Sequence, residues 1–498
     1  MRTFWMVIGC LLAMGCAPSE PPVSPPQVEP EVDPPVEPAD PRYAQLPQPA
    51  PAQPWAPPEA SRTQLQNGLS VWHMPQSSAP LVSLHLVLPK GSAGDPRGKE
   101  GLTLLAADLL DEGAGPFNAL ELSDELGKLA TDYSSSGGMD HVLLSMDCLA
   151  ENLDQSLGLL AEIVLRPRLL REEFERRKKH YEAEAIAARD DPHAARKNAL
   201  ARALFSGGYG SGAGRGTTKS LSTISYQDAL RRAREITVPD GAHLTFSGAI
   251  DAAQVVAATQ KHFGKWKGQA TSEGPAVQPA PEGQRAFLVD FPGAAQSSLV
   301  IAKRAGGDRD PSYFAEEVMH QKLGGSFTGR INMNLREDKG YTYGAFSLFR
   351  RYKRAGYFAV AADVKTETTQ DSIREVFREL SDVCESRPLT DQERDEAVEG
   401  MLLGYPLEFD QVSSAGYKLA SLPLRGRPTD FWTTWPAKIE RVSKDRANQA
   451  ARAYCDPKAY IVVVAGDAKR VRPGLEALGL HVIDVDAEGE LKASELSP

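Results

Sequence analysis

Residues 140–177 read DHVLLSMDCLAENLDQSLGLLAEIVLRPRLLREEFERR, and residues 356–397 read GYFAVAADVKTETTQDSIREVFRELSDVCESRPLTDQERDEA. Each stretch starts with a short apolar run that is typical of a strand and continues with the periodicity of an amphipathic helix. Each then breaks at an Arg-Pro pair, at Pro167 and at Pro388, before a second helical segment begins. The same order of elements therefore recurs after about 220 residues, which indicates an internal duplication.

The duplication extends to both sides of these stretches. An apolar alternating run at residues 79–95 has a counterpart at residues 294–310, and the strand, glycine turn and helix of residues 242–266 have one at residues 459–479. Strands grouped with long helices predict an α+β fold with two homologous halves, each a largely antiparallel sheet covered by helices. We place the halves at residues 61–268 and 284–487, with a Gly, Pro, Gln and Ser-rich linker at 269–283 and a tail at 488–498.

The first sixteen residues, MRTFWMVIGCLLAMGC, have the charge and the short apolar run of a secretion signal. This segment resembles bacterial lipoprotein signals, which implies that Cys16 becomes the lipidated first residue and that the protein is an outer-membrane lipoprotein facing the periplasm. Ordinary cleavage, giving a soluble periplasmic protein, is the alternative. Residues 17–60 hold 16 of the 37 prolines and few aliphatic residues, so we expect a disordered Pro/Glu-rich tether.

The formal charge of −10 is unevenly spread, because residues 17–60 carry seven acidic residues against Arg42 alone. No basic stripe is present in the sequence, which argues against nucleic acid as a partner. Cys148, Cys384 and Cys455 remain after the signal and lack the close spacing of a metal knuckle. We expect buried thiols, with one disulfide as the alternative.

Residues 323–344, LGGSFTGRINMNLREDKGYTYG, place Arg336 and Tyr343 seven positions apart across a predicted helix-to-strand junction. Phe327, Ile331 and Leu335 recur at helical spacing, Ser326 or Thr328 is suited to cap the helix start, and Gly340 to end it. A guanidinium and a phenol together offer the donors needed to hold a peptide carbonyl. The structural alternative is an arginine paired with Glu337 or Asp338 and a tyrosine filling a strand face.

Two segments carry a resemblance to a known family. Residues 67–115 resemble the opening of the insulinase-like (pitrilysin) zinc metallopeptidases, and residues 323–344 resemble their C-terminal motif, within a likeness that covers about residues 62–485. Active members carry His-x-x-Glu-His on a helix that follows the glycine matching Gly101. Here the two histidine positions fall at Leu104 and Asp108 and the glutamate position at Ala107. A third ligand would lie near Glu182 or Glu184, so we expect no metal in this chain.

The resemblance also assigns roles to the second motif. In the family, an arginine and a tyrosine with this spacing project toward a zinc site, and some members divide the zinc motif and the Arg/Tyr pair between two chains. It implies that Arg336 and Tyr343 act in trans, with Gly324, Gly325 and Ser326 binding substrate, in a heterodimer whose zinc-bearing partner hydrolyses peptides or unfolded segments. The alternative function is a catalytically dead scaffold or peptide-binding envelope lipoprotein.

Three weaker patterns are interpreted structurally. The glycine-rich run at residues 206–218 lacks the Gly-Lys-Ser/Thr ending of a phosphate loop, so we expect a flexible loop. His180 and Glu184 lie four residues apart in a basic helical segment, which indicates a solvated surface. The remaining histidines, including His73, His85 and His141, show no paired spacing and are expected to be structural or exposed.

Overall fold

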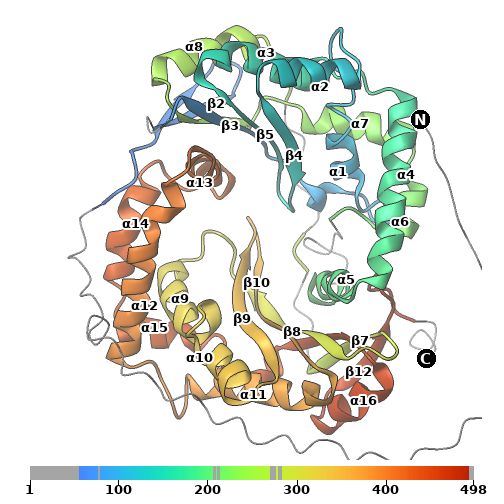
Figure 1. The fold of residues 1–498 in the computed structure, drawn as a ribbon, viewed down its shortest axis with the longest axis vertical. Helices are drawn as coiled ribbons and strands as arrows, with labels where there is room; N and C mark the ends of the chain where they lie inside the picture. Colours follow the sequence, from blue (N-terminus) through green and yellow to red (C-terminus); the bar gives the residue numbers. More distant parts are fainter. Residues whose placement is uncertain are drawn as a thin grey trace, which may run out of the picture. The chain divides into compact units, whose positions relative to one another are not determined.

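The computed structural model describes residues 55–76, 79–205, 209, 214–269, 276–278 and 283–492. The expected signal peptide with Cys16 and most of the expected tether lie outside the described residues, as does most of the glycine-rich run at 206–218. Within the described chain, the framework is a pair of six-stranded sheets, which Figure 1 shows with their covering helices.

The first sheet belongs to the first half of the chain. Its strand order is β1-β2-β6-β3-β5-β4, with all neighbours antiparallel except the parallel pair β2–β6. The strands are β1 (Ser61–Gln64), β2 (Ser70–Pro75), β3 (Leu81–Leu88), β4 (Asp132–Gly137), β5 (Val142–Leu149) and β6 (His243–Gly248).

The second sheet has the order β12-β7-β11-β8-β10-β9, and β7 pairs in parallel with both β11 and β12. The strands are β7 (Arg285–Asp290), β8 (Gln296–Ala305), β9 (Thr342–Arg351), β10 (Gly356–Lys365), β11 (Ile461–Gly466) and β12 (His481–Val485). The order β2-β6-β3-β5-β4 thus matches β7-β11-β8-β10-β9 strand for strand, which confirms the α+β fold with two homologous halves.

Helices occupy the expected positions between these strands. Those of the first half are α1 (Leu102–Ala107), α2 (Ala119–Lys128), α3 (Leu153–Leu165), α4 (Arg171–Ala187), α5 (Pro192–Phe205), α6 (Thr218–Thr223), α7 (Tyr226–Ile236) and α8 (Ala252–Phe263). Those of the second half are α9 (Tyr313–His320), α10 (Arg330–Asn332), α11 (Thr369–Asp382), α12 (Asp391–Gly404), α13 (Val412–Leu424), α14 (Phe431–Glu440), α15 (Lys444–Ala451) and α16 (Ala468–Ala477). The predicted breaks at Pro167 and Pro388 separate α3 from α4 and α11 from α12.

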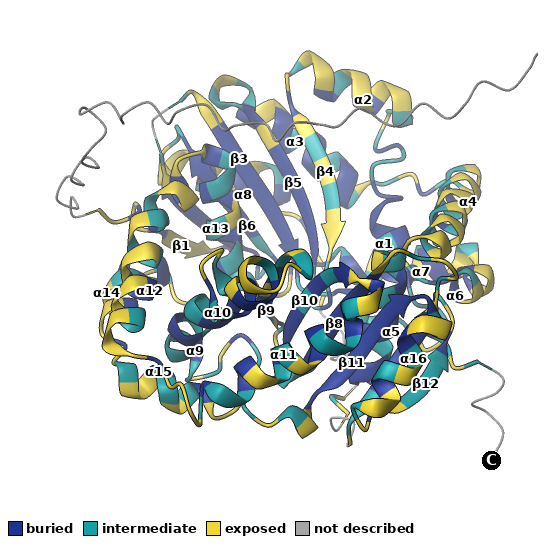
Figure 2. Cartoon of the chain, turned by 60° about the horizontal axis from the view of Figure 1, so that its bottom comes forward, coloured by how far each residue is buried: buried dark blue, intermediate teal, exposed yellow. Residues whose placement is uncertain are grey.

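Each sheet has one face packed on the helices of its own half. Leu84, Leu86 and Phe246 of the first sheet share a buried cluster with α3 and α8, and Phe358 and Val360 of the second share one with α9 and α11. Most strands are buried along their length, whereas β4, at the edge of the first sheet, is largely exposed (Figure 2). Burial of these apolar faces, at roughly 25 cal/mol per Å², is the main stabilising contribution.

The opposite faces are covered by a reciprocal exchange of helices between the halves. Helix α13, from the second half, packs on β3 and β6 of the first sheet, where Ala420 contacts Val87 and Leu143. Helix α5, from the first half, packs on β8 and β11 of the second sheet through Ala195 and Ala199. The face of each sheet that is turned away from its own helices is therefore covered by a helix from the other half of the chain (Figure 1).

A polar cluster lies beneath α13. His85 accepts or donates hydrogen bonds at 2.8 Å to Ser145 and 3.2 Å to Ser83, and its ring lies 4.6 Å from that of Tyr417. Burial lowers the pKa of His85 to about 4, so the imidazole is neutral at physiological pH. His85 is thus structural, as the sequence predicted.

Gly416 allows α13 to approach this cluster. A Cβ at this position would lie 2.6 Å from Oγ of Ser83 and 2.8 Å from Nε2 of His85. We expect Gly416→Ala to lower the free energy of unfolding by about 1–3 kcal/mol, because buried His85 cannot move aside, as denaturant titration will measure. Gly400→Ala is the matched control, since nothing lies within 4 Å of its added Cβ in α12. That variant should be neutral or more stable by up to about 1 kcal/mol, and equal effects at both sites would contradict the close packing.

The predicted helix in residues 323–344 is only partly correct. A π-helical turn at Gln321–Gly325 comes first, Gly329 precedes the helix that starts at Arg330, and a second π-helical segment covers Met333–Asp338. Ser326 and Thr328 therefore do not cap the helix, and Phe327 lies before it with 55% of its surface exposed. Gly340 has φ of 63°, so its predicted left-handed conformation after the helix is confirmed.

For the cysteines, the expectation of buried thiols holds only for Cys148, and the alternative of one disulfide is confirmed. Cys384, after α11, and Cys455, after α15, form a disulfide 71 residues apart in sequence, and only Cys148 is a buried free thiol among the described cysteines. Burial raises the pKa of Cys148 to about 11, which keeps the thiol protonated and unreactive.

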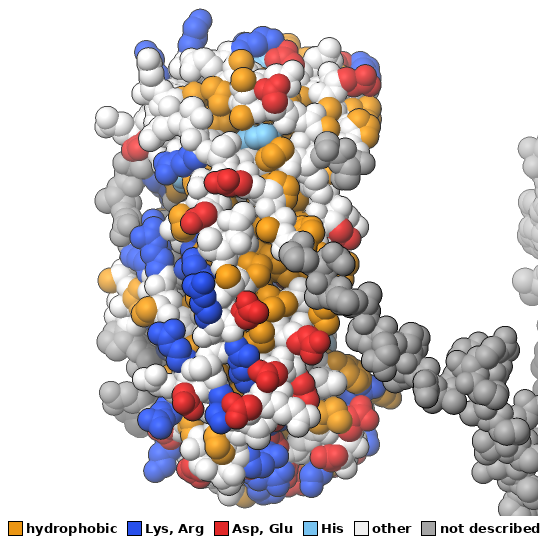
Figure 3. Space-filling model, turned by 90° about the vertical axis from the view of Figure 1, so that its left-hand side faces the viewer, with side chains coloured by type: hydrophobic (Ala, Val, Ile, Leu, Met, Phe, Trp, Pro, Cys, Tyr) orange, Lys and Arg blue, Asp and Glu red, His pale blue; other side chains and the backbone are white. Residues whose placement is uncertain are grey.

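The surface of the described residues offers no membrane-spanning helix, since none is both long and apolar enough. On the face around α12 and α14, positive and negative side chains are interspersed with hydrophobic ones (Figure 3).

Candidate functional site

Helix α1 carries the three positions that match the zinc motif. Ala107 is fully buried, and Leu104 is half-buried, with its side chain against Gly137 of β4. The neighbouring Leu105, Leu109 and Leu110 are fully buried in the first core, although α1 itself ends at Ala107. Two of the three positions therefore offer only hydrocarbon.

Asp108 is the one potential ligand on this segment, and its carboxylate is already engaged. Oδ2 accepts hydrogen bonds from Arg177 at 2.8 Å and from the hydroxyl of Tyr181 at 2.6 Å, both on α4. Asp108 is only 7% exposed, and a buried carboxylate needs a positive charge beside it. Here the guanidinium of Arg177 supplies that charge, and no metal is needed for it.

Further ionisable groups surround this pair. Burial raises the pKa of Asp111 to about 7, and the nearby carboxylates of Glu112 and Asp108 add to the effect. Burial also raises the pKa of Tyr133 and of Tyr181, the latter with help from Asp108. Burial and the neighbouring carboxylates therefore both disfavour the ionised form of Asp111.

Glu182 and Glu184, the positions proposed for a third metal ligand, pair with other side chains instead. Glu184 pairs with His180 at 3.1 Å and with Arg215 at 2.9 Å, and all three side chains are substantially exposed. Glu182 lies 4.0 Å from Lys178. His180 and Glu184 therefore form the predicted surface pair.

Among the residues that the structure describes, no group of three His, Cys, Asp or Glu side chains is arranged to hold a metal ion. The donor set that the family uses for zinc does not fit here, because Leu104 and Ala107 have no donor atom and Asp108 is bound by Arg177. These side chains are instead packed in the first core or paired with α4, and the absence of a metal from this chain stays a prediction.

Arg336 lies in the π-helical segment before β9. Its guanidinium stacks on the ring of Phe327 at 4.4 Å and approaches Glu337 at 3.3 Å, while its side chain keeps 34% of its surface exposed. The nitrogen that approaches Glu337, Nη1, is buried and makes no hydrogen bond of good geometry with any described residue. The contact with Glu337 is the structural role considered from the sequence, but it leaves donor capacity on the guanidinium.

Tyr343 is held out from the sheet by a β-bulge. Thr342 pairs with Val364 and Ala345 with Ala362, so Tyr343 and Gly344 together lie opposite Asp363 alone. The side chain of Tyr343 is 91% exposed, which excludes the alternative in which it fills a buried strand face. Arg336 and Tyr343 flank the junction as predicted, without a direct hydrogen bond between them among the contacts of the described residues.

Strand β9, which carries Tyr343, is an edge strand with an apolar outer face. Phe346 and Leu348 are 42% and 36% exposed, and Met333, just before the strand, is 38% exposed. Because β9 ends the strand order of its sheet, one row of its backbone groups is open to pairing with an extended peptide or another chain. Nothing in the sequence pattern marked this face, apart from the alternation of residues 342–351.

Gly324, Gly325 and Ser326 lie where the first π-helical turn meets β9. A Cβ on Gly324 would lie 2.8 Å from Ser347, and one on Gly325 would lie 2.7 Å from the ring of His320. Ser326 donates a hydrogen bond of 2.9 Å to the carbonyl of Gln321. Close packing explains why these positions are small, and their predicted contact with substrate stays a prediction.

Sequence reasoning missed Arg177 and Tyr181 as partners of Asp108. The two residues lie four positions apart on α4, so they project from one side of that helix, but only the fold shows that this side meets α1. The fold and the site thus define a duplicated α+β protein with a buried Asp108–Arg177 pair in its first half and an exposed Arg/Tyr pair in its second.

Comparison with known proteins identifies the family. Residues 72–213 match the domain described as Insulinase (Peptidase family M16), and residues 223–401 match the Peptidase M16 inactive domain. The chain is a member of the insulinase, or M16, peptidase family.

Curated relatives agree over most of the chain. An uncharacterized zinc protease of Mycobacterium tuberculosis is 22% identical, over 82% of this chain and 93% of its own length. The protein named non-peptidase homolog YmxG of Helicobacter pylori is 20% identical, over 78% of this chain and 90% of its own length.

Solved structures support the fold. The peptidase M16 inactive domain from Pseudomonas fluorescens has a TM-score of 0.76 at 20% identity, covering 82% of this chain and 98% of its own. A chain of Complex III2 from Candida albicans has a TM-score of 0.70 at 15% identity, covering 84% and 99%. At these identities the likeness establishes the architecture only.

Proposed function

We propose that this chain is the non-zinc-binding subunit of a heterodimeric M16 metallopeptidase. In this function it supplies Arg336 and Tyr343 in trans to the active site of a zinc-bearing homologous partner. The observation that carries the proposal is the contrast between Tyr343, 91% exposed on an edge strand, and Asp108, 7% exposed and bound by Arg177. The Arg/Tyr end of the proposed site is thus open to solvent, whereas the positions of the zinc motif are buried and paired.

The chemistry assigned to the pair follows from its donors. Peptide hydrolysis develops negative charge on the carbonyl oxygen, and a guanidinium and a phenolic hydroxyl both donate hydrogen bonds to such an oxygen. The open edge of β9 and its apolar face suit an extended peptide beside these groups, since main-chain pairing fixes the register of the peptide. Zinc is expected in the partner, and none in this chain.

A second function is favoured by one contact. Arg336 stacks on Phe327 and pairs with Glu337, so a purely structural role for this arginine is compatible with a catalytically dead scaffold or peptide-binding protein of the envelope. The relative named a non-peptidase homolog shows that the family includes proteins so described. The export and lipid anchor at Cys16 remain proposals that apply to either function.

The two functions are separated by reconstitution. The purified chain should contain far less than one zinc per molecule by elemental analysis and cleave no peptide. Mixed with a zinc-bearing M16 partner, it should co-elute as a heterodimer and raise peptide turnover above that of the partner alone. Zinc near one per chain would overturn the proposal, and a stable heterodimer without any gain in turnover would favour the scaffold.

A further inference from the structure

A cavity of about 1010 Å³ lies between the two halves, on the side of the chain where α13 ends. Eight lysine or arginine side chains line it, against three acidic ones. The whole chain has a formal charge of −10, so this concentration of positive charge runs against the overall balance. Nothing in the proposed peptidase role uses it.

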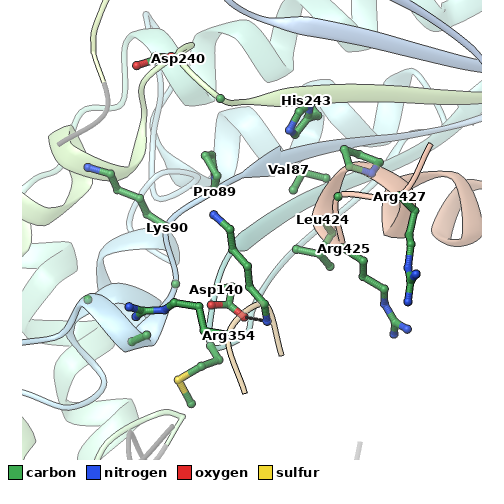
Figure 4. Close-up of a pocket in the computed structure, with 18 of the residues that line it drawn as sticks. Val87, Pro89, Lys90, Asp140, Asp240, His243, Arg354, Leu424, Arg425 and Arg427 are labelled. Atoms are coloured by element: carbon green, nitrogen blue, oxygen red, sulfur yellow. Dashed lines mark hydrogen bonds between the residues drawn. The ribbon is translucent and has the colours of Figure 1, made fainter. Parts of the chain in front are cut away.

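The basic side chains come from separate segments. The first half supplies Arg62, Lys90 and Arg232, and the second supplies Arg309, Lys353, Arg354, Arg425 and Arg427. Figure 4 shows Lys90, Arg354, Arg425 and Arg427 reaching the cavity from different directions, with Arg425 and Arg427 on the same loop.

The three acidic side chains of the lining offset only part of this positive charge. Asp140 accepts hydrogen bonds from the hydroxyl of Tyr209 at 2.5 Å and from the backbone N–H of Lys353 at 2.8 Å. Glu235 pairs with Arg232 at 3.1 Å, and Asp240 is also engaged. The eight cations nevertheless outnumber the acidic side chains of the lining, which leaves the cavity with a net positive charge.

Two of the cationic side chains that line the cavity have no polar partner within the described part of the chain. Arg309 and Lys353 are exposed, and their side chains make no hydrogen bond or ion pair with any described residue. In addition, Nε of Arg427 is buried without a hydrogen-bond partner. A ligand with several anionic oxygens would satisfy these donors.

Two glycines shape the walls for arginine side chains. A Cβ on Gly426 would lie 2.0 Å from a terminal nitrogen of Arg309, and one on Gly94 would lie 2.5 Å from a terminal nitrogen of Arg232. The guanidinium groups thus lie directly against the backbone. Burial is the main cause that lowers the pKa of Arg427 and of Lys90. Nearby arginines lower both further, whereas Asp308 and Tyr313 raise the pKa of Arg427 and Glu235 raises that of Lys90.

Apart from His243, the remaining side chains of the lining are apolar. Trp72, with Arg62 stacked 5.3 Å from its ring centroid, lies beside Val87, Met139 and Leu424. An apolar wall beside convergent charges is typical of sites for small organic ligands rather than for bare ions.

We propose that this cavity binds a small organic polyanion, with two or more phosphate or carboxylate groups, between Arg309 and Lys353 of the second half and the basic residues of the first. Such a ligand neutralises the cluster and bridges the two halves. The proposal is independent of the peptidase role, because it involves neither Arg336 nor Tyr343 and needs no partner chain.

The test uses the whole purified chain and two probes, sodium pyrophosphate and sodium citrate, each compared with sodium chloride at equal ionic strength. Binding to the folded state alone should raise the thermal midpoint in a saturable manner, by about 2 °C or more at high occupancy. Calorimetric titration gives the stoichiometry, expected to be one site per chain. A response to pyrophosphate only assigns phosphate groups to the ligand, and a response to citrate only assigns carboxylates.

The double variant Arg309→Gln/Lys353→Gln should weaken binding about tenfold or more, since two charge-assisted hydrogen bonds are lost. Both side chains are exposed and unpaired, so the variant should fold. The matched control is Lys128→Gln/Arg374→Gln, which removes the same charge from exposed pairs with Glu125 and Asp371 and should bind as the parent does. No midpoint rise beyond that of chloride, or equal affinity in the two double variants, would overturn the proposal.

Discussion

Replacing Tyr343 with phenylalanine is expected to lower kcat of the complex with a zinc-bearing partner by about a hundredfold or more. Loss of one donor to the developing oxyanion costs about 3–4 kcal/mol of barrier stabilisation, which corresponds to this factor. The free energy of unfolding should not change, because the side chain is 91% exposed and its hydroxyl makes no hydrogen bond to any described residue. Steady-state kinetics and denaturant titration on the same preparation measure both quantities.

Arg336→Ala should reduce kcat to a similar extent. Its matched control is Arg350→Ala, an exposed arginine farther along β9, and the control for Tyr343→Phe is the half-buried Tyr341 changed to Phe. Both controls should retain turnover within about twofold of the parent, a difference of only about 0.4 kcal/mol. If all four variants turned over alike, the pair would have no catalytic role and the scaffold function would be preferred.

The largest expected loss of stability comes from Arg351→Ala. Arg351 and Glu316 have side chains only 3% and 4% exposed and pair at 2.7 Å, and the hydroxyl of Tyr454 donates a hydrogen bond of 2.6 Å to the same carboxylate. Removing the guanidinium leaves a buried, uncompensated carboxylate, which typically costs about 3–5 kcal/mol. Denaturant titration should show a decrease of this size.

The surface pair between Arg374 and Asp371 supplies the comparison for this variant. Their side chains are 54% and 49% exposed, so Arg374→Ala should change the free energy of unfolding by about 1 kcal/mol or less. The double variant Arg351→Met/Glu316→Leu should recover part of the loss, since it leaves no buried charge behind. A loss below about 1 kcal/mol for Arg351→Ala would show that Glu316 finds other compensation.

The architecture could be predicted from the sequence because periodicity can be recognised within each short segment and because the two halves repeat the same order of segments. The equivalent breaks at Pro167 and Pro388 and the paired strand-turn-helix segments locate most elements of the two sheets. The predicted start of the helix before Arg336 was wrong, because Ser326 donates its hydrogen bond back to Gln321 and the helix starts at Arg330, after Gly329. A capping residue is only one of several ways to satisfy the first backbone donors.

The site was less accessible from the sequence, because its geometry depends on contacts between distant segments. Asp108 and Arg177 are 69 residues apart, and the disulfide joins cysteines 71 residues apart. Spacing alone cannot bring such residues together. The bulge that projects Tyr343 arises from the pairing of β9 with β10, and a register shift of one residue has no local signature.

The exchange of α5 and α13 makes the two halves mutually dependent. A fragment ending near residue 268 would keep α5 but lose the helix that seals its own sheet, so the polar cluster around His85 would meet water. The complementary fragment would be left with an uncovered apolar surface around Val300 and Val463. The two halves look like separate modules in the sequence, but each depends on a helix of the other. They should therefore unfold and refold together in one cooperative transition.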